Sequence, residues 1–229
     1  MAAKDHILIN GFKHVLYQSE QLSQQESIER SETYYNWLDT RRSVREYSDK
    51  DIPKEVIENI IKAASTAPSG AHKQPWTFCA ISNADLKHKI RLAAEEEERI
   101  SYGGRMSDRW LKDLAPFGTD DNKPFIDIAP WIIVVFKRVY EFEGEEKHNN
   151  YSVNESVGIA SGMLISAIHN AGLVTLTHTP SPMRFLTKIL ERPENERPFL
   201  LLPIGYPKQP SYVPDIHRKP LEDIAVFYE

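Results

Sequence analysis

The stretch WIIVVF at residues 131–136 is a continuous run of aromatic and β-branched residues. It predicts a short buried strand, because it lacks the polar alternation of a strand with one face in solvent. WTFCAI at 76–81 has the same character, and residues 173–177 and 199–204 are predicted as two further strands. We therefore expect a sheet within a mixed α+β chain.

Helices are predicted around these strands. A period near 3.6 is shown by the apolar residues Val56, Ile57, Ile60, Ile61 and Ala64. This stripe follows Pro53, which suits the first turn of a helix, so one face of that helix should pack on the core. Segments 26–38, 83–110 and 182–190 are further helical candidates. Residues 154–171 form the longest candidate and are apolar on most sides, which indicates a central helix or a helix at a subunit interface.

Length and composition limit the classes of protein that this chain can represent. With 229 residues and no low-complexity linker, we expect one compact domain at 26–229 after an irregular arm at 1–25. The formal net charge of −5 argues against a nucleic-acid-binding surface. Cys79 is the only cysteine, which excludes an intrachain disulfide and a cysteine-rich metal site. No apolar run approaches the length that spans a bilayer, so we expect a soluble, cytoplasmic protein without a metal.

A dense cluster of positive charge lies at Arg41-Arg42-Ser43-Val44-Arg45. Arginine presents a planar fork of donors that matches phosphate, and Arg42 beside Ser43 offers a phosphate two charge-assisted hydrogen bonds and a hydroxyl donor. The same five residues also suit a basic patch at the start of a solvated strand, since short basic runs often have no binding role. Both interpretations are open from the pentapeptide alone.

Polar residues recur at three later turns or element ends, namely Ser69-Gly70, Thr177-His178-Thr179 and Arg218-Lys219. This distribution suits an anionic cofactor that lies across several loops. Neither GxGxxG nor a P-loop sequence is present, so a Rossmann dinucleotide site and a Walker site are not supported. The histidines lack HExxH spacing, and the residues by themselves identify no reaction.

A run of four glutamates at 95–98 precedes the pair Gly103-Gly104 and a loop that contains proline, glycine and aspartate. A charge run is usually a solvated helix face, and at most one or two of four consecutive residues can point into one site. Glu98 and Tyr102 are four residues apart and share a helix face. A charged helix end followed by glycines and a loose loop has the character of a lid, which we place at about 95–123.

Several ordered motifs resemble those of the flavin-dependent nitroreductase superfamily. They are RRSVR at 41–45, TAPSGAH at 66–72, PWTF at 75–78 and GLVTLTHTP at 172–180. A second set resembles, within that superfamily, the iodotyrosine deiodinase family. It consists of KHKIR at 87–91, EEEERISY at 95–102, RW at 109–110, LLPIGYP at 201–207 and VPDIHRKP at 213–220. The resemblance implies a nitroreductase-like three-layer α/β/α fold of the α+β class, with a mixed, mainly antiparallel sheet flanked by helices, and an intertwined homodimer.

The resemblance also implies FMN as the cofactor, bound at the homodimer interface. The implied cofactor-binding residues are Arg41, Arg42, Ser43, Val44, Arg45, Ser69, Gly70, Thr177, His178, Thr179 and Arg218. In the family the threonine before the proline donates a hydrogen bond toward flavin N5, which makes Thr179 the catalytic candidate. His178 stands where animal members of the family have threonine, and a packing role and a catalytic role are both open for it.

A halogenated tyrosine is the substrate that the resemblance implies. Glu98, Tyr102 and Lys123 would hold its amino-acid end, and the backbone N–H of Ala71 would bind its phenolate. A zwitterion needs a carboxylate for its ammonium and an ammonium for its carboxylate, which Glu98 and Lys123 supply.

The expected activity is FMN-dependent reductive dehalogenation of mono- and diiodotyrosine, with bromo- and chlorotyrosine as further candidates. Tyrosine and halide would form through single-electron steps from reduced flavin, with an external reductase or NAD(P)H as the electron source. Two alternatives remain open. One is a general FMN-dependent nitroreductase or quinone reductase, and the other is a flavoprotein that binds halotyrosine without turnover.

Overall fold

A computed structural model describes residues 6–229, so the first five residues of the predicted arm lie outside the described residues. The chain divides into two compact units, Met1–Arg41 and Arg42–Glu229. The sequence predicts the end of the arm at residue 25, whereas the first unit also includes the helix that follows. Among the described residues, no helix is long and apolar enough to cross a membrane.

The first unit contains a hairpin of β1 (His6–Ile9) and β2 (Phe12–Val15). Asn10 and Gly11 connect the strands with φ angles of 51° and 82°, the left-handed pair that a type I′ turn requires. The prediction of an irregular arm is therefore wrong for residues 6–15. Asn-Gly between two short apolar runs is a strong hairpin signal, and it outweighs the weak periodicity of four-residue strands.

Helix α1 (Gln24–Asp39) confirms the helix predicted at 26–38. It begins with a capping box, in which Glu26 N–H donates to Ser23 Oγ (3.2 Å) and Ser23 N–H donates to Glu26 Oε2 (2.8 Å). These bonds satisfy backbone donors that have no partner within the helix, so the start of α1 is determined by two side chains of its own segment.

The second unit is built on a four-stranded sheet with the order β3-β4-β8-β7, in which each neighbouring pair is antiparallel. Its strands are β3 (Trp76–Ile81), β4 (Trp131–Arg138), β7 (Val174–Thr175) and β8 (Glu196–Gly205). All four predicted strands are confirmed, although β7 is shorter than predicted. The hairpin of β5 (Tyr140–Glu143) and β6 (Glu146–Asn149), which follows β4, was not predicted.

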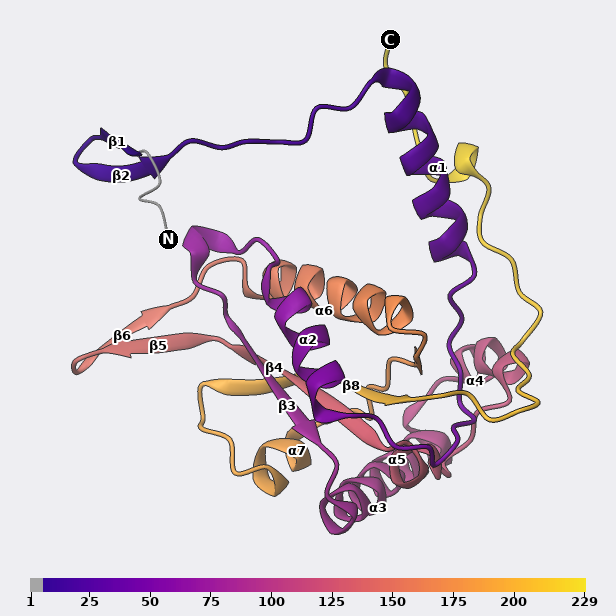
Figure 1. The fold of residues 1–229 in the computed structure, drawn as a ribbon. Coiled ribbons are helices and arrows are strands. Elements are labelled where there is room, and N and C mark those ends of the chain that lie inside the picture. The colour runs from indigo at the N-terminus through magenta and orange to yellow at the C-terminus, as the bar shows by residue number, and fades with distance from the viewer. Residues whose placement is uncertain (1–5) are drawn as a thin grey trace. The chain divides into compact units, whose positions relative to one another are not determined.

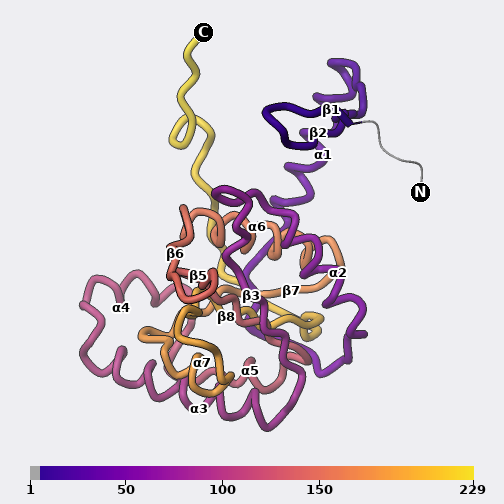
Figure 2. The backbone as a smooth tube through the Cα atoms, turned by 90° about the vertical axis from the view of Figure 1, so that its left-hand side faces the viewer, coloured from indigo at the N-terminus to yellow at the C-terminus, as the bar shows by residue number. Residues whose placement is uncertain are grey.

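Helices cover both faces of this sheet and form the predicted three layers, as Figures 1 and 2 show. One face is covered by α2 (Lys54–Ser65) and α6 (Val153–Asn170), and the other by α3 (Ala84–Ile100), α5 (Phe125–Ile128) and α7 (Arg184–Ile189). Between α3 and α5 lie a π-helical turn at Ser101–Arg105, α4 (Asp108–Leu114) and a 3₁₀ turn at Ala115–Phe117. Two more 3₁₀ turns lie at Gly70–His72 and Leu221–Asp223. The helix predicted at 83–110 is thus broken at its glycine pair.

Strand β4 joins the two helical layers because both of its faces are buried. Ile133 and Val135 pack in the cluster with α2 and α6. Ile132, Val134 and Phe136 pack in the cluster with α3, α5 and α7. This alternation is expected for a strand with a core on each face. The apolar run at 131–136 therefore contributes to two cores at once.

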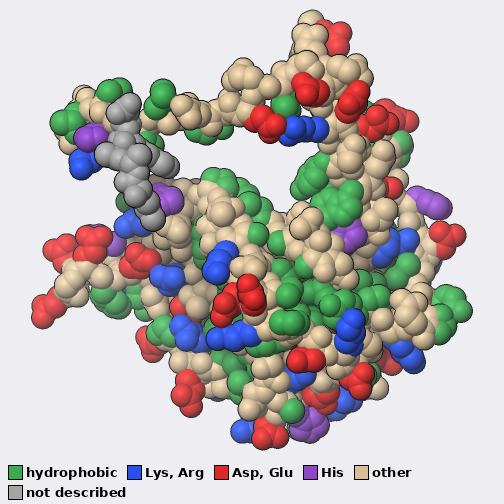
Figure 3. Space-filling view, viewed as in Figure 1, with side chains coloured by type: hydrophobic (Ala, Val, Ile, Leu, Met, Phe, Trp, Pro, Cys, Tyr) green, Lys and Arg blue, Asp and Glu red, His purple; other side chains and the backbone are tan. Residues whose placement is uncertain are grey.

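Helix α6 buries only part of its surface within the chain. Its buried residues are Ser156, Val157, Ala160, Ser161, Leu164 and Ile168. Another face leaves Gly158, Ile159 and Gly162 exposed, and Ile159 retains 47% of its accessible surface. Hydrophobic side chains also reach the surface on the view in Figure 3, where they are green. The helix therefore packs one face on the core and presents Ile159 at the surface on another.

Ile90 and Leu92 lie on the same helix, but Ile90 is fully buried while Leu92 is 53% exposed. We expect Ile90→Ala to lower the free energy of unfolding by about 2–5 kcal/mol, because it leaves a cavity between α3 and the sheet. Leu92→Ala should change it by less than about 1 kcal/mol. Denaturant unfolding followed by circular dichroism measures both, and equal losses would contradict the buried face assigned to α3.

Candidate active site

A pocket with a volume of about 160 Å³ lies in the second unit, between the end of α3, the loop before α5 and the chain that follows β7. It is lined by Arg45, Glu98, Tyr102, Met106, Trp110, Leu114, Thr119, Lys123, Phe125, Leu176, Thr177, His178 and Thr179. Seven of these residues are predicted site residues, namely Arg45, Glu98, Tyr102, Lys123 and residues 177–179. The fold thus brings predicted cofactor ligands and predicted substrate ligands to one place.

Residues 177–179 form an extended segment that β8 holds in position. His178 N–H donates to Leu201 O (2.8 Å), and Leu201 N–H donates to His178 O (3.0 Å). Side chains alternate along such a segment, so Thr177 and Thr179 are exposed while His178 between them is buried. The segment therefore presents two hydroxyl groups on one side and an imidazole on the other.

The His178 ring lies within the pocket wall. It packs edge-on against Phe125 at a centroid distance of 5.7 Å, and its Nδ1 lies 4.0 Å from Glu98 Oε1. His178 Nε2 is buried and has no hydrogen-bond partner among the described residues. Burial, aided by the positive charges of Lys123 and Arg45, lowers the pKa of His178 to about 3. The ring is therefore neutral, and its Nδ1 faces Glu98 in the pocket.

Glu98 and Lys123 form the charged centre of the pocket. Glu98 Oε2 lies 3.7 Å from Lys123 Nζ, and only 8% and 3% of the two residues are exposed. Burial raises the pKa of Glu98 and lowers the pKa of Lys123, while the opposite charge of each partner counteracts the shift in the other. A ligand that carries both an ammonium and a carboxylate can take the place of this ion pair without leaving either charge unpaired.

Tyr102 lines the same pocket as Glu98, as their spacing of four residues predicts. It lies in the π-helical turn, a wide turn that is frequent at functional sites. Its hydroxyl donates to Thr119 O (3.1 Å), and Lys123 Nζ lies 5.7 Å from the centre of its ring. Tyr102 therefore links the π-helical turn to the loop before Lys123, within the segment 95–123 that is predicted as a lid.

The residues of the basic cluster 41–45 lie in different environments. Val44 has a buried side chain, its N–H donates to Thr175 O (3.3 Å), and its carbonyl accepts the Tyr47 hydroxyl (2.9 Å). Both backbone polar groups of Val44 are therefore engaged within the chain. Ser43 is exposed beside Thr175, with which it forms a parallel bridge, and Arg45 reaches the pocket.

Arg42 connects the basic cluster to the C-terminal segment, because its Nη2 donates to Pro214 O. Pro214 precedes Arg218, another predicted cofactor ligand, by four residues. Arg41 is the last residue of the first unit. Arg42 is thus bonded within the chain and Arg45 lines the pocket, so these two side chains do not form a purely solvated patch.

Ser69, Gly70 and Ala71 are not among the residues that line the pocket in one chain. They lie beside the start of α6, where Gly70 N–H donates to Ser156 Oγ (3.3 Å). A Cβ at Gly70 would lie 3.0 Å from Tyr151 O, so a larger residue would press on the backbone there. The structure therefore separates these three predicted ligands from the others.

Two parts of the site were not predicted. Met106, Trp110 and Leu114 form an apolar wall of the pocket. Helix α4 carries two of these residues, and with seven residues it is too short for its periodicity to be recognised in the sequence. Glu95 is buried beside the pocket, whereas the charge run predicts a solvated position for most of its glutamates. Glu95 and Glu98 are the two buried members of the run, so the expectation of at most two inward glutamates is confirmed. The spacing of three residues between Glu95 and Glu98 indicates that both lie on one face of the helix.

The sequence model of the nitroreductase family matches residues 38–206, which is more than half of the chain. The chain belongs to the nitroreductase family. This membership confirms the predicted resemblance, and the antiparallel sheet between helical layers is the predicted nitroreductase-like fold.

Members of this family named iodotyrosine deiodinase are similar to the chain over most of its length. It is 58% identical to the Haliscomenobacter hydrossis protein, over 93% of this chain and 96% of that protein. It is 45% identical to iodotyrosine deiodinase 1 of Homo sapiens, over 93% of this chain and 75% of the human protein. A crystal structure of oxidised iodotyrosine deiodinase bound to FMN and 3-iodo-L-tyrosine matches with a TM-score of 0.73 and 29% identity. That match covers 86% of this chain and 98% of the other.

We expect the His178 imidazole to remain neutral between about pH 5 and 8, since its environment disfavours the charged form. Nitrogen–proton correlation NMR of the imidazole rings measures this, with His178→Gln to assign the signals. The folded pKa of about 3 lies below the ordinary pKa of histidine, 6.5, so the unfolded chain binds more protons between these two values. The contribution of His178 to stability therefore decreases as the pH falls through this window. A ring that titrates near its ordinary value would contradict the buried environment.

Proposed function

We propose that this chain catalyses the FMN-dependent reductive deiodination of iodotyrosine to tyrosine and iodide. The buried Glu98–Lys123 pair carries the proposal, because it lies in the pocket that the hydroxyl-bearing segment 177–179 also lines. A substrate with both charges of an amino acid matches this pair, whereas a nitroaromatic compound or a quinone would leave it unused. The pocket therefore favours a zwitterionic substrate.

The relatives support the same assignment. Proteins at 58% and 45% identity are named iodotyrosine deiodinase, and the solved deiodinase holds FMN and 3-iodo-L-tyrosine. We extend both ligands to this chain because its pocket combines hydroxyl donors with an opposite-charge pair. The activity would thus be that of an FMN-dependent oxidoreductase of the deiodinase type.

The donor set of this chain fits FMN. Guanidinium groups such as those of Arg42 and Arg45 have the planar donor geometry that matches a phosphate. The residues proposed to hold the phosphate and the edge of the ring are Arg41, Arg42, Ser43, Arg45 and Arg218. Thr177 and Thr179 present exposed hydroxyls, and Thr179 is the proposed donor to flavin N5. When bound, FMN supplies the two electrons of the reaction.

The reaction balances with two electrons and one proton. The carbon–iodine bond breaks, iodide leaves, and a carbon–hydrogen bond forms to give tyrosine. The electrons come ultimately from a nicotinamide donor, NAD(P)H, directly or through an external reductase. Since electron supply belongs to the cofactor, the residues of the chain act by binding and orienting the substrate.

In the proposed complex the substrate ammonium binds Glu98 and its carboxylate binds Lys123, with Tyr102 beside both. The neutral ring of His178 leaves the charge of Glu98 available, because a protonated ring 4.0 Å away would compete for it. The apolar wall that includes Trp110 limits access of water, which strengthens these electrostatic contacts.

Ser69, Gly70 and Ala71 are proposed to complete the site from a second copy of the chain. They do not line the pocket of their own chain, and they adjoin α6, whose outer face exposes Ile159 between two glycines. A second copy that covers this apolar face would form a symmetric homodimer, the commonest oligomer of soluble proteins. In that arrangement the Ala71 N–H is the proposed donor to the substrate phenolate.

A cytoplasmic location is also proposed, since the free Cys79 suits a reducing compartment.

Anaerobic addition of 3-iodotyrosine to the dithionite-reduced, FMN-loaded protein tests the reaction. We expect flavin oxidation and release of about one iodide per reduced flavin, since both are two-electron changes. Absorbance and an iodide electrode measure these products, with free reduced FMN as the control. Binding without flavin oxidation would instead indicate a non-catalytic halotyrosine-binding flavoprotein. Rapid reduction of a nitroaromatic compound without iodotyrosine binding would indicate a general nitroreductase.

Glu98→Gln should weaken binding of 3-iodotyrosine by about tenfold or more but that of iodophenol by less than about twofold, because only iodotyrosine carries an ammonium. Absorbance changes of the oxidised, FMN-loaded protein report both dissociation constants. Glu96→Gln is the matched control, since Glu96 lies on the same helix with its side chain 62% exposed. Equal losses for the two ligands would rule out the proposed contact with the ammonium.

A further inference from the structure

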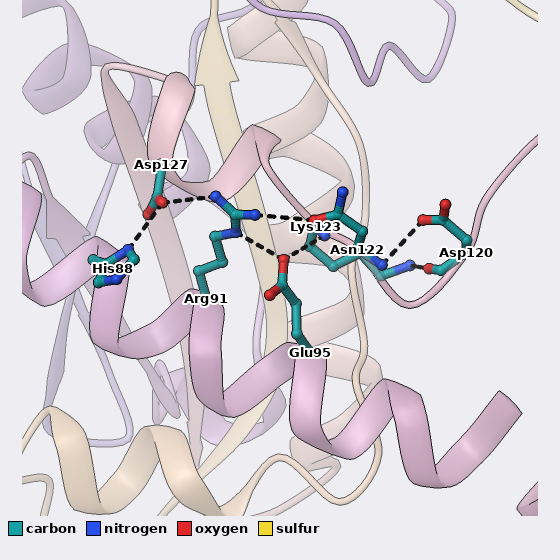
Figure 4. Close-up of polar contacts among 7 residues, drawn as sticks. All are labelled: His88, Arg91, Glu95, Asp120, Asn122, Lys123 and Asp127. Atoms are coloured by element: carbon teal, nitrogen blue, oxygen red, sulfur yellow. Dashed lines mark hydrogen bonds and ion pairs between the residues drawn. The ribbon is translucent and has the colours of Figure 1, made fainter. Parts of the chain in front are cut away.

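Glu95 is a second buried carboxylate beside the pocket, about one helical turn before Glu98. Its Oε1 accepts two hydrogen bonds of 2.7 Å each, one from Arg91 Nε and one from the backbone N–H of Lys123. Figure 4 shows this carboxylate on α3 between the arginine and the loop. Glu95 therefore holds the main chain of a residue whose side chain lines the pocket.

Arg91 links Glu95 to two further segments (Figure 4). Its Nη1 donates to Asp127 Oδ2 (3.0 Å) in α5, and its Nη2 donates to Asn122 Oδ1 (2.9 Å) in the loop before Lys123. Each of the three guanidinium nitrogens thus has an acceptor on a different residue. Because the donors of a guanidinium lie in one rigid plane, they fix the positions of the acceptors relative to one another.

The main chain of Lys123 is held on both sides. Its N–H donates to Glu95, and its carbonyl accepts Ile126 N–H (3.1 Å) at the start of α5. From this anchored backbone the ammonium lies 3.7 Å from Glu98 Oε2 and donates to Thr119 Oγ1 (3.1 Å) and to Asp120 O. The residue follows a loop rather than a helix, so its backbone anchors act together with these side-chain contacts to place the ammonium in the pocket.

We propose that Glu95 and Arg91 are positioning residues for substrate binding, which hold the Lys123 ammonium where it can take the carboxylate of the substrate. This inference rests on the proposed function, since it concerns the same pocket. A role in stability alone explains the contacts less well, because a buried ion pair often contributes little net stability. Arg91 and Glu95 also bind two consecutive residues of the loop, Asn122 and Lys123, which is the arrangement expected of residues that position this loop.

Glu95→Ala removes the shared acceptor and tests the proposal in the oxidised, FMN-loaded protein. We expect binding of 3-iodotyrosine to weaken by about tenfold, while binding of iodophenol changes by less than about twofold, because only iodotyrosine has a carboxylate for Lys123. Glu96→Ala is the control from the exposed face of α3. A loss that is equal for both ligands would overturn the positioning role and indicate a general structural effect.

Glu95→Gln keeps an oxygen that can accept both N–H groups and loses only the charge. Its dissociation constant for 3-iodotyrosine should lie between those of the wild type and Glu95→Ala. This conservative variant also retains the buried volume. If the alanine variant does not fold, Glu95→Gln should still weaken binding of 3-iodotyrosine more than that of iodophenol, and equal losses for both ligands would overturn the proposal. A Gln variant that binds 3-iodotyrosine as weakly as the Ala variant would contradict the shared-acceptor geometry.

A double-mutant comparison shows whether Glu95 acts through Lys123. In a Lys123→Met background, Glu95→Ala should change 3-iodotyrosine binding by less than about twofold, since residues that act as one unit are not additive. A full effect of Glu95→Ala in that background would overturn the proposal.

Hydrogen exchange tests the hydrogen bond between the Lys123 amide and Glu95 without reference to the reaction. The Lys123 amide should exchange at least about tenfold faster in Glu95→Ala than in the wild type or in Glu96→Ala, because its acceptor is lost. An unchanged exchange rate of the Lys123 amide would overturn the proposal that Glu95 holds the Lys123 backbone. If the wild type binds iodotyrosine and iodophenol equally, the proposed function fails, and faster exchange in Glu95→Ala would still support the hold on Lys123.

Discussion

Antiparallel pairing of β4 on both of its edges, together with burial of both of its faces, is the constraint on which the rest of the structure depends. A strand in this position leaves no surface for solvent, so helices must cover each side of the sheet. Leu201 of β8 pairs with Val134 on β4 and, on its other edge, with His178. The core that contains Val134 and Leu201 also contains Ile90 and Ala94 of α3. The pocket thus forms at the edge of this core, where the ordered sheet meets the end of α3.

The buried polar groups around Glu98 comprise one ion pair and one neutral ring. Glu98 and Lys123 remain close enough to compensate each other, while the neutral ring of His178 adds no third charge next to them. An unpaired buried charge would be expensive, so the pair remains stable only while both members are held in place. This requirement explains why the loop that carries Lys123 is anchored to α3 by side chains outside the pocket.

Different structural elements carry the two halves of the proposed chemistry. The segment 177–179 is held by strand pairing, which is rigid and presents Thr177 and Thr179 in fixed directions. Glu98, Tyr102 and Lys123 come instead from a helix end and a loop that are joined by side-chain bonds. A rigid cofactor wall and a separately anchored substrate wall allow substrate selection to change while the flavin chemistry is kept.

Local patterns in the sequence determined the strands at 76–81 and 131–136, the helices with one apolar face, and the ordered motifs that identify the family. The Asn10-Gly11 turn and the shared helix face of Glu95 and Glu98 are also determined by local sequence. Only the tertiary structure decided that Glu95 binds the backbone of Lys123, 28 residues away, and that His178 faces Glu98. Periodicity records which side of an element meets a core, because that depends on neighbours in sequence. Periodicity does not indicate which polar groups meet across the core, because the distances between such groups depend on how segments distant in the sequence pack together.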